Sequence, residues 1–238
     1  MKKFYDKNQL IFSLLLIVIY IVGSSVCENI SKIFVIFFHA AFSLVLVSFI
    51  YKNNLVSRYG LLKSNIPAGK FLYYIPLLIL STCSLWFGLS DNILDVNNII
   101  LMISMLLVGF LEEIIFRGFL FVSMAKDNIK SAIIVSSITF GIGHIINLFS
   151  GMNFVSNMCQ CVEAIAFGFL FVILFYRGKS LIPCICAHST INMLSVFGAT
   201  KVSQMSEIII SSGICLVVII YIFLLLKNLP KPESEVKE

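Results

Sequence analysis

The sequence has 238 residues, of which 59% are hydrophobic and only 12% are charged. A water-soluble domain carries charge on roughly a quarter of its residues, so this composition argues against a soluble fold. The net charge of +5 comes from basic residues in short segments between apolar runs, with no basic stripe of the kind that nucleic-acid binding needs. We therefore expect contact with the lipid bilayer and no nucleic-acid partner.

The apolar runs have the length of membrane-crossing helices, for which about 20 residues are needed. They predict an all-α fold, a polytopic bundle of about eight transmembrane helices, because backbone groups in lipid must be hydrogen-bonded within the chain. In chain order the predicted spans cover residues 9–27, 33–51, 71–90, 99–125, 131–149, 157–176, 180–198 and 207–226.

We divide the chain into three parts: N-terminal transmembrane helices over 1–98, a core of four helices over 99–198, and a last helix with a charged tail over 199–238. The tail from Lys227 is expected to be disordered, because it is short, charged and interrupted by Pro230 and Pro232.

The placement of lysine and arginine predicts the orientation of the bundle. With the N-terminus in the cytoplasm, fourteen basic residues fall on the inner side and only Lys32 and Lys201 on the outer side. Both termini are therefore expected in the cytoplasm, which requires an even number of spans. The predicted location is the cell membrane, and the Ile-, Lys-, Asn- and Phe-rich composition suggests an AT-rich bacterium.

Seven cysteines lie mostly inside the apolar runs, so no disulfide framework is expected. The two Cys-x-Cys pairs, Cys159/Cys161 and Cys184/Cys186, would point to nearly opposite sides of a helix and make poor chelates. We interpret most of these residues as small core side chains.

A few ionisable side chains lie inside the predicted spans, where charge is costly and marks a functional site. They are Glu112, Glu113, Arg117, Glu163, His39, His144 and His188. Counted from the inner basic residues at about 1.5 Å per residue, five polar residues lie roughly 13–21 Å deep. These five are Glu112, His144, Glu163, His188 and Asn192. Polar residues from separate spans thus share one level.

Spacing within the spans assigns different faces to neighbouring acids. Glu113 and Arg117 are four residues apart and form a predicted pair that neutralises the guanidinium. Glu112 points about 100° away and is free to face a cavity. His188 and Asn192 share another helical face. A carboxylate and a histidine can deprotonate a water, and a second histidine with an amide can stabilise an oxyanion, which is what peptide-bond hydrolysis requires.

Other interpretations of these residues stay open. The Glu112–Glu113 pair is also compatible with an ion or proton site of a transporter. The His188–Asn192 face is compatible with interhelical hydrogen bonding. His39 has no polar companion at helical spacing, which favours a structural role. Glu163 is either a supporting partner of a site histidine or of Arg117, or a residue near the outer water.

Three motifs together resemble those of one family of intramembrane peptidases. They are Glu112-Glu113-Ile-Ile-Phe-Arg117-Gly118, Phe140-Gly-Ile-Gly-His144 and His188-Ser-Thr-Ile-Asn192. Their order and spacing are similar to the CAAX prenyl protease and bacteriocin-processing family, also called Abi, over about residues 99–195. The resemblance implies that Glu112 is the general base, that His144 holds the attacking water, and that His188 and Asn192 stabilise the oxyanion. Glu113 and Arg117 complete the first motif as mainly structural residues.

Members of this family are often labelled metalloproteases, and Glu112, His144 and His188 are the residues that would bind zinc. The sequence has no His-Glu-x-x-His motif, and an amide is a poor zinc ligand, so we favour a mechanism without metal or other cofactor.

The resemblance implies an intramembrane endopeptidase acting on a membrane-associated peptide or protein. The expected substrates are a bacteriocin leader, a pheromone precursor or a CAAX-like end. One alternative is a non-enzymatic bacteriocin immunity or scaffold protein. The other is a transporter built around Glu112, Glu113 and Glu163, which the lack of internal repeats disfavours.

Overall fold

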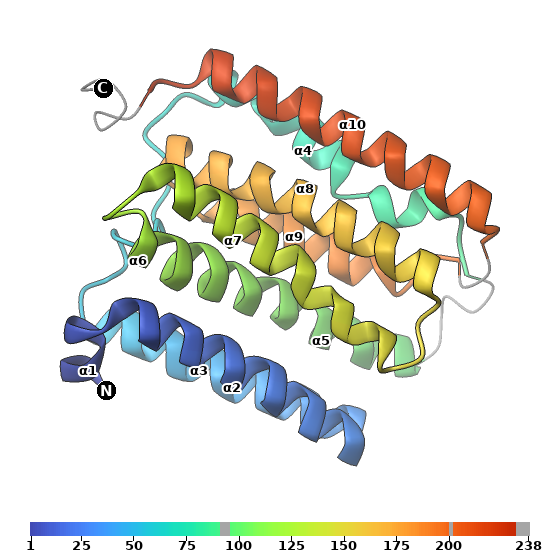
Figure 1. The fold of residues 1–238 in the computed structure, drawn as a ribbon, viewed down its shortest axis with the longest axis horizontal. Coiled ribbons are helices and arrows are strands. Elements are labelled where there is room, and N and C mark those ends of the chain that lie inside the picture. The colour runs from blue at the N-terminus through green and yellow to red at the C-terminus, as the bar shows by residue number, and fades with distance from the viewer. Residues whose placement is uncertain (91–95, 200–201, 232–238) are drawn as a thin grey trace.

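The protein folds as a bundle of helices in the computed structural model, which describes residues 1–90, 96–199 and 202–231 (Figure 1). In these residues, seven helical segments are long and apolar enough to cross a membrane. The segments are α2 (Gln9–Ile30), α3 (Lys32–Lys52), Ala68–Phe87, Asn98–Met124, Ile129–Leu148, α8 (Phe154–Gly178) and α10 (Gln204–Asn228). The prediction of an all-α, polytopic membrane protein is confirmed.

Several of these segments combine shorter helices with different backbone geometry. The first is η1 (Ala68–Tyr74), α4 (Ile75–Leu80) and η2 (Cys83–Phe87); the second is α5 (Val96–Glu112), η3 (Glu113–Phe121) and α6 (Val122–Met124). The third is α7 (Ile129–Gly143) with η4 (His144–Leu148). A short helix, α1 (Lys2–Lys7), precedes α2.

The segment expected as one helix over 71–90 is broken. Leu72, Tyr73 and Tyr74 have φ angles of 53°, 53° and 60°, in the left-handed region. Such residues cannot continue a right-handed helix. Pro76 then lies in the first turn of α4, where its missing N–H costs nothing. The chain therefore turns at the tyrosines before α4 begins.

The span expected over 180–198 is a helix of only 14 residues, α9 (Ile182–Ser195). At 1.5 Å per residue it is about 21 Å long, shorter than the hydrocarbon core. It packs against α5, α8 and α4, and its residues Cys184, Ala187, His188 and Ser189 are buried. This helix is thus an internal element of the bundle that carries site residues; of the about eight expected spans, seven reach crossing length in the described residues, and this one is shorter than predicted.

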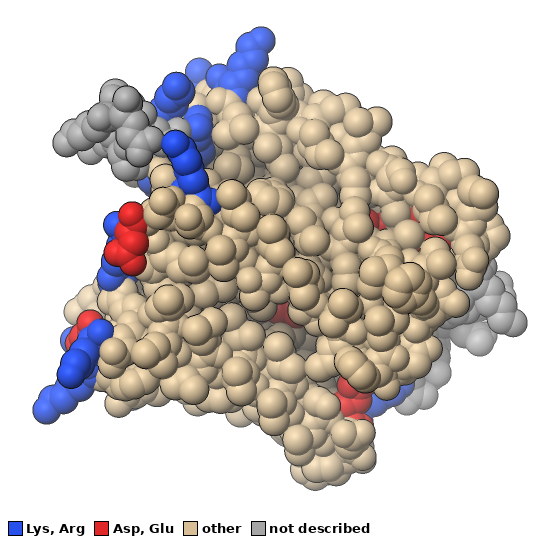
Figure 2. Space-filling model, viewed as in Figure 1, with Lys and Arg blue, Asp and Glu red and all other residues tan. Residues whose placement is uncertain are grey.

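Helix α1 and the last turn of α10 lie at one end of the bundle (Figure 1). In Figure 1, α1 and the last turn of α10 lie at the left end, and Figure 2 shows lysine and arginine side chains gathered there beside a largely uncharged middle. This arrangement agrees with the prediction that both termini share a side, while the cytoplasmic identity of that side stays a prediction. Within the expected tail, Lys227 and Asn228 end α10, and residues 232–238 lie outside the described residues.

Helices distant in sequence meet around η3. It contacts α2, α7, α8 and α9, while α5 packs between α3 and α9. All nine residues of η3 are buried. The polar residues of this segment are therefore shielded from lipid on every side by other helices, as buried polar groups in a membrane require.

Candidate active site

The polar cluster begins where α5 changes into a π-helix. Residues Glu113–Phe121 form π-type turns, which are rare and often occur at functional sites. The Ser136 hydroxyl of α7 donates to the Phe116 carbonyl oxygen at 3.0 Å. The wider π turn alters the direction of successive side chains, and its first residue is Glu113, directly after Glu112.

His188 lies between the two adjacent carboxylates. Its Nδ1 is 2.8 Å from Oε1 of Glu113, and its Nε2 is 3.4 Å from Oε2 of Glu112. Glu113 is completely buried, and Glu112 and His188 are 9% and 6% exposed. The expectation that the two acids face apart is therefore only partly met: one imidazole joins them, because it approaches from α9 at the start of the π turn.

The predicted pair of Glu113 and Arg117 is confirmed. Arg117 Nη1 donates to Glu113 Oε1 at 2.9 Å, and both side chains are fully buried. The guanidinium carbon lies 4.1 Å from the ring centre of Phe140 and 5.5 Å from that of Phe171. Cation–π contacts of this kind add stabilisation where the cation is shielded from water. Glu113 also binds His188, because the same Oε1 atom is hydrogen-bonded to His188 Nδ1.

Tyr20 of α2 is a site residue that the sequence does not reveal. Its hydroxyl donates to Glu112 Oε1 at 3.0 Å, and the side chain is 8% exposed. The only sequence signal is a phenol in the middle of an apolar span, and the motifs give no reason to connect it to Glu112. With this bond, one Glu112 oxygen is held by Tyr20 and the other faces His188.

Close packing of α5 against α9 brings these groups together. A Cβ atom at Gly109 would lie 2.6 Å from the backbone nitrogen of Ser189, closer than real Cβ contacts. The Ser189 hydroxyl in turn donates to the Leu106 carbonyl oxygen at 3.0 Å. The distance between Glu112 and His188 therefore depends on a glycine one turn before the carboxylates.

His144 lies at the edge of the cluster. It is the first residue of η4 and is partly buried, with its ring centre 5.5 Å from that of Phe140 in edge-on geometry. Glu112, His188 and Arg117 are its electrostatic neighbours. The Asn157 amide donates to the His144 carbonyl oxygen at 2.9 Å, which fixes the backbone where the helix tightens.

Asn192 is partly buried on α9, one turn after His188. The same turn of helix places both side chains on one face, as the spacing predicts. The Asn192 carbonyl oxygen accepts a hydrogen bond from the Ser195 hydroxyl at 2.7 Å.

The remaining two residues singled out in the sequence lie elsewhere. His39 is buried, with ring nitrogens 3.0 Å from the Ser24 hydroxyl and 3.4 Å from the Ser104 hydroxyl, so it links α2, α3 and α5. This agrees with a structural role. Glu163 of α8 has Ser211 and Glu207 of α10 as neighbours rather than Arg117 or a site histidine.

The zinc set considered from the sequence does not fit the observed geometry. Across the described part of the chain, no three His, Cys, Asp or Glu side chains are placed together to bind a metal ion. Tyr20 bonds one Glu112 oxygen and Glu113 bonds His188 Nδ1, while Glu112 Oε2 and His188 Nε2 face each other at 3.4 Å.

The fold and this cluster define a polytopic membrane protein with a buried Glu–Glu–His–Arg site. Residues 96–194 match the family model described as Type II CAAX prenyl endopeptidase Rce1-like. The resemblance to CAAX prenyl proteases is thereby confirmed over this segment, which contains Glu112, His144, His188 and Asn192, while Tyr20 lies outside it. No curated protein and no solved structure matched the chain.

Proposed function

We propose that the protein is an intramembrane endopeptidase that cleaves a membrane-associated peptide or protein with a water activated by Glu112. The observation that carries the proposal is the placement of Glu112 in a buried site, with Tyr20 on one oxygen and His188 Nε2 at 3.4 Å from the other. A general base needs such contact with groups that hold and relay protons. The match to a protease family supports the same conclusion.

The charges of the clustered side chains leave room for one additional proton in the site. Glu112 and Glu113 carry two negative charges and Arg117 one positive charge, which leaves an excess negative charge in a buried place. Such charges are strongly disfavoured unless compensated. One proton on His188, whose Nε2 lies 3.4 Å from Glu112 Oε2, makes the cluster neutral and leaves Glu112 as a carboxylate. Glu113 keeps Nδ1 of the ring protonated, so Nε2 is the nitrogen that exchanges this proton.

In the proposed reaction, the Glu112 carboxylate takes a proton from water, and the hydroxide oxygen bonds to the carbonyl carbon of the substrate. The C=O electron pair moves to oxygen, which Asn192 stabilises, while His144 holds the water. The C–N bond then breaks, and its electron pair takes the proton relayed through His188. The products are a carboxylic acid and an amine, and transfer of the acid proton to the amine gives a carboxylate and an ammonium group. His188 thus acts as a proton carrier, because its Nε2 faces Glu112.

The proposed substrate is a peptide presented from the cytoplasmic side of a bacterial cell membrane, such as a bacteriocin leader, a pheromone precursor or a CAAX-like end. Its support is the depth expected from the sequence for Glu112, His144, His188 and Asn192 below the inner basic residues. No step is routed through a metal, because the donor set described above does not fit one.

Peptidomics of cells that make the wild-type chain or Glu112→Gln tests this proposal. We expect peptides with a common cleavage position in wild-type cells, and their loss in Glu112→Gln and His144→Ala at equal protein levels. If both variants keep the wild-type peptides and the full biological effect, the enzymatic proposal is wrong and a scaffold or immunity role replaces it.

A further inference from the structure

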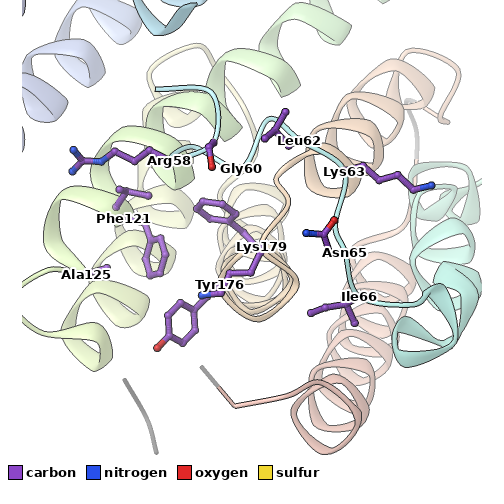
Figure 3. A pocket seen from close by; sticks show the side chains of 13 residues that line it. Arg58, Gly60, Leu62, Lys63, Asn65, Ile66, Phe121, Ala125, Tyr176 and Lys179 are labelled. Carbon is purple, nitrogen blue, oxygen red and sulfur yellow. The ribbon is translucent and has the colours of Figure 1, made fainter. Parts of the chain in front are cut away.

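The two ends of α8 pack differently. Its last turns border a cavity of about 550 Å³ at the basic end of the bundle, where Phe175 and Tyr176 form part of the lining (Figure 3). Its first half packs tightly on α7, because a Cβ atom at Gly141 would lie 2.7 Å from the backbone nitrogen of Ile165, closer than real Cβ contacts. Tight packing leaves little room for movement between the two helices. The first half of α8 is therefore a fixed support beside the site.

Asn157 in this half of α8 carries a fully buried amide. Its Nδ2 donates to the His144 carbonyl oxygen at 2.9 Å. Its other two contacts are with sulfur, 3.7 Å from Nδ2 to Met152 Sδ and 3.8 Å from Oδ1 to Cys161 Sγ. Sulfur is a weak hydrogen-bonding partner, so the contact with His144 is the strong bond of this amide. Asn157 thus holds the backbone of the residue to which the proposed reaction assigns the water.

A second amide of α8 holds η4 near its other end. Asn147 Nδ2 donates to Gln160 Oε1 at 2.9 Å. Side chains three residues apart eclipse in a 3₁₀-helix, so Asn147 lies on the same face of η4 as His144. Asn157 and Gln160 are also three residues apart and are neighbours on the surface of α8. Two adjacent amides therefore hold η4 at its first and fourth residues.

The imidazole of His144 depends on this support. Within residues 1–90, 96–199 and 202–231, no side chain is hydrogen-bonded to the ring, which contacts Phe140 edge-on. The direction of the ring therefore follows from the backbone of η4. Because two points of attachment fix the rotation of a short helix about its axis, they also fix the direction of the Cα–Cβ bond of His144.

We infer that Asn157 and Gln160 are positioning residues, which together form an amide clamp on η4 and direct the His144 imidazole toward Glu112. The inference rests on the proposed function, in which His144 holds the attacking water. Glu112 is an electrostatic neighbour of His144. The clamp acts through His144 and not on the substrate, so its loss should lower kcat and leave KM unchanged. A misplacement of about 1 Å in an active site can cost about 100-fold in rate.

Kinetics of the full chain on the peptide identified by peptidomics, at equal amounts of folded protein, test the clamp. Asn157→Ala should lower kcat about 10- to 100-fold, and Gln160→Asn, which shortens one side chain by a methylene group, about 10-fold. Asn147→Gln/Gln160→Asn restores the summed length of the bonded pair and should recover the wild-type kcat. The control is Asn128→Ala, which removes the N-cap of α7 at its far end. It should lower the melting temperature and keep kcat.

The NMR signal of the His144 ring in histidine-labelled protein gives a readout that does not need hydrolysis. The chain has three histidines, so the signal is identified by its loss in His144→Ala. It should shift in Asn157→Ala and Gln160→Asn and stay in place in Asn128→Ala. A wild-type ring signal or a wild-type kcat in both clamp variants would overturn the inference. If the ring signal shifts as expected but wild type and Glu112→Gln hydrolyse the peptide equally, the peptidase proposal is wrong, while the clamp still orients His144.

Discussion

Replacing Tyr20 with phenylalanine removes one hydroxyl and leaves the shape of the side chain unchanged. That hydroxyl is the donor to Glu112 Oε1, at 3.0 Å. A hydrogen bond to a charged group contributes about 1.5–3 kcal/mol, so we expect kcat to fall roughly 10- to 100-fold. KM should stay unchanged, because the hydroxyl contacts the proposed base and not the substrate.

The assay is the initial rate of hydrolysis of a peptide that carries the cleavage site found by peptidomics. Tyr221→Phe is the matched control, since its buried hydroxyl donates to the Phe71 carbonyl oxygen at 3.0 Å, away from the cluster. It should lose about 1 kcal/mol of stability and keep wild-type kcat. An unchanged kcat in Tyr20→Phe, or an equal fall in Tyr221→Phe, would refute the reasoning.

Three further predictions concern the packing around the site, its buried ion pair and its independence of metal. Gly109→Ala should push α5 away from α9, because the added Cβ would lie 2.6 Å from the backbone nitrogen of Ser189. We expect a loss of about 1–3 kcal/mol of stability together with a loss of hydrolysis. A wild-type melting curve and a wild-type rate would contradict this prediction. Arg117→Ala removes the cation beside the buried Glu113 carboxylate, which then keeps its bond to His188, and should cost about 3–5 kcal/mol in thermal unfolding, whereas a neutral effect would show that Glu113 is not ionised. Treatment with a chelator should leave the hydrolysis rate intact; its loss, with recovery on adding zinc, would make the metal-free mechanism wrong.

Much of the fold follows from the sequence, because hydrophobic length and charge placement are one-dimensional signals. The Glu113–Arg117 pair was also predictable, since four-residue spacing on a helix fixes which side chains meet. Depth counting placed Glu112 and His188 at one level, and the structure brings them to 3.4 Å.

The remaining features depend on tertiary contacts that no local pattern encodes. The π-helix at Glu113 is stabilised by neighbours such as Ser136, and it lets one imidazole reach both acids. Tyr20 reaches Glu112 only because α2 packs on η3, although 92 residues separate the two. The left-handed tyrosines that break the span expected over 71–90 carry no glycine or other marker of a turn at their own positions.

The hydrolysis rate of Glu112→Gln, measured on the identified peptide, tests the central claim most directly. The amide keeps the size of the side chain and can still accept the Tyr20 hydrogen bond, but it cannot take a proton from water. We predict a fall of roughly 10²- to 10⁴-fold, with the wild-type rate retained in Glu207→Gln, a glutamate bonded to Ser156 on α8. A wild-type rate in Glu112→Gln would contradict the assignment of Glu112 as the base.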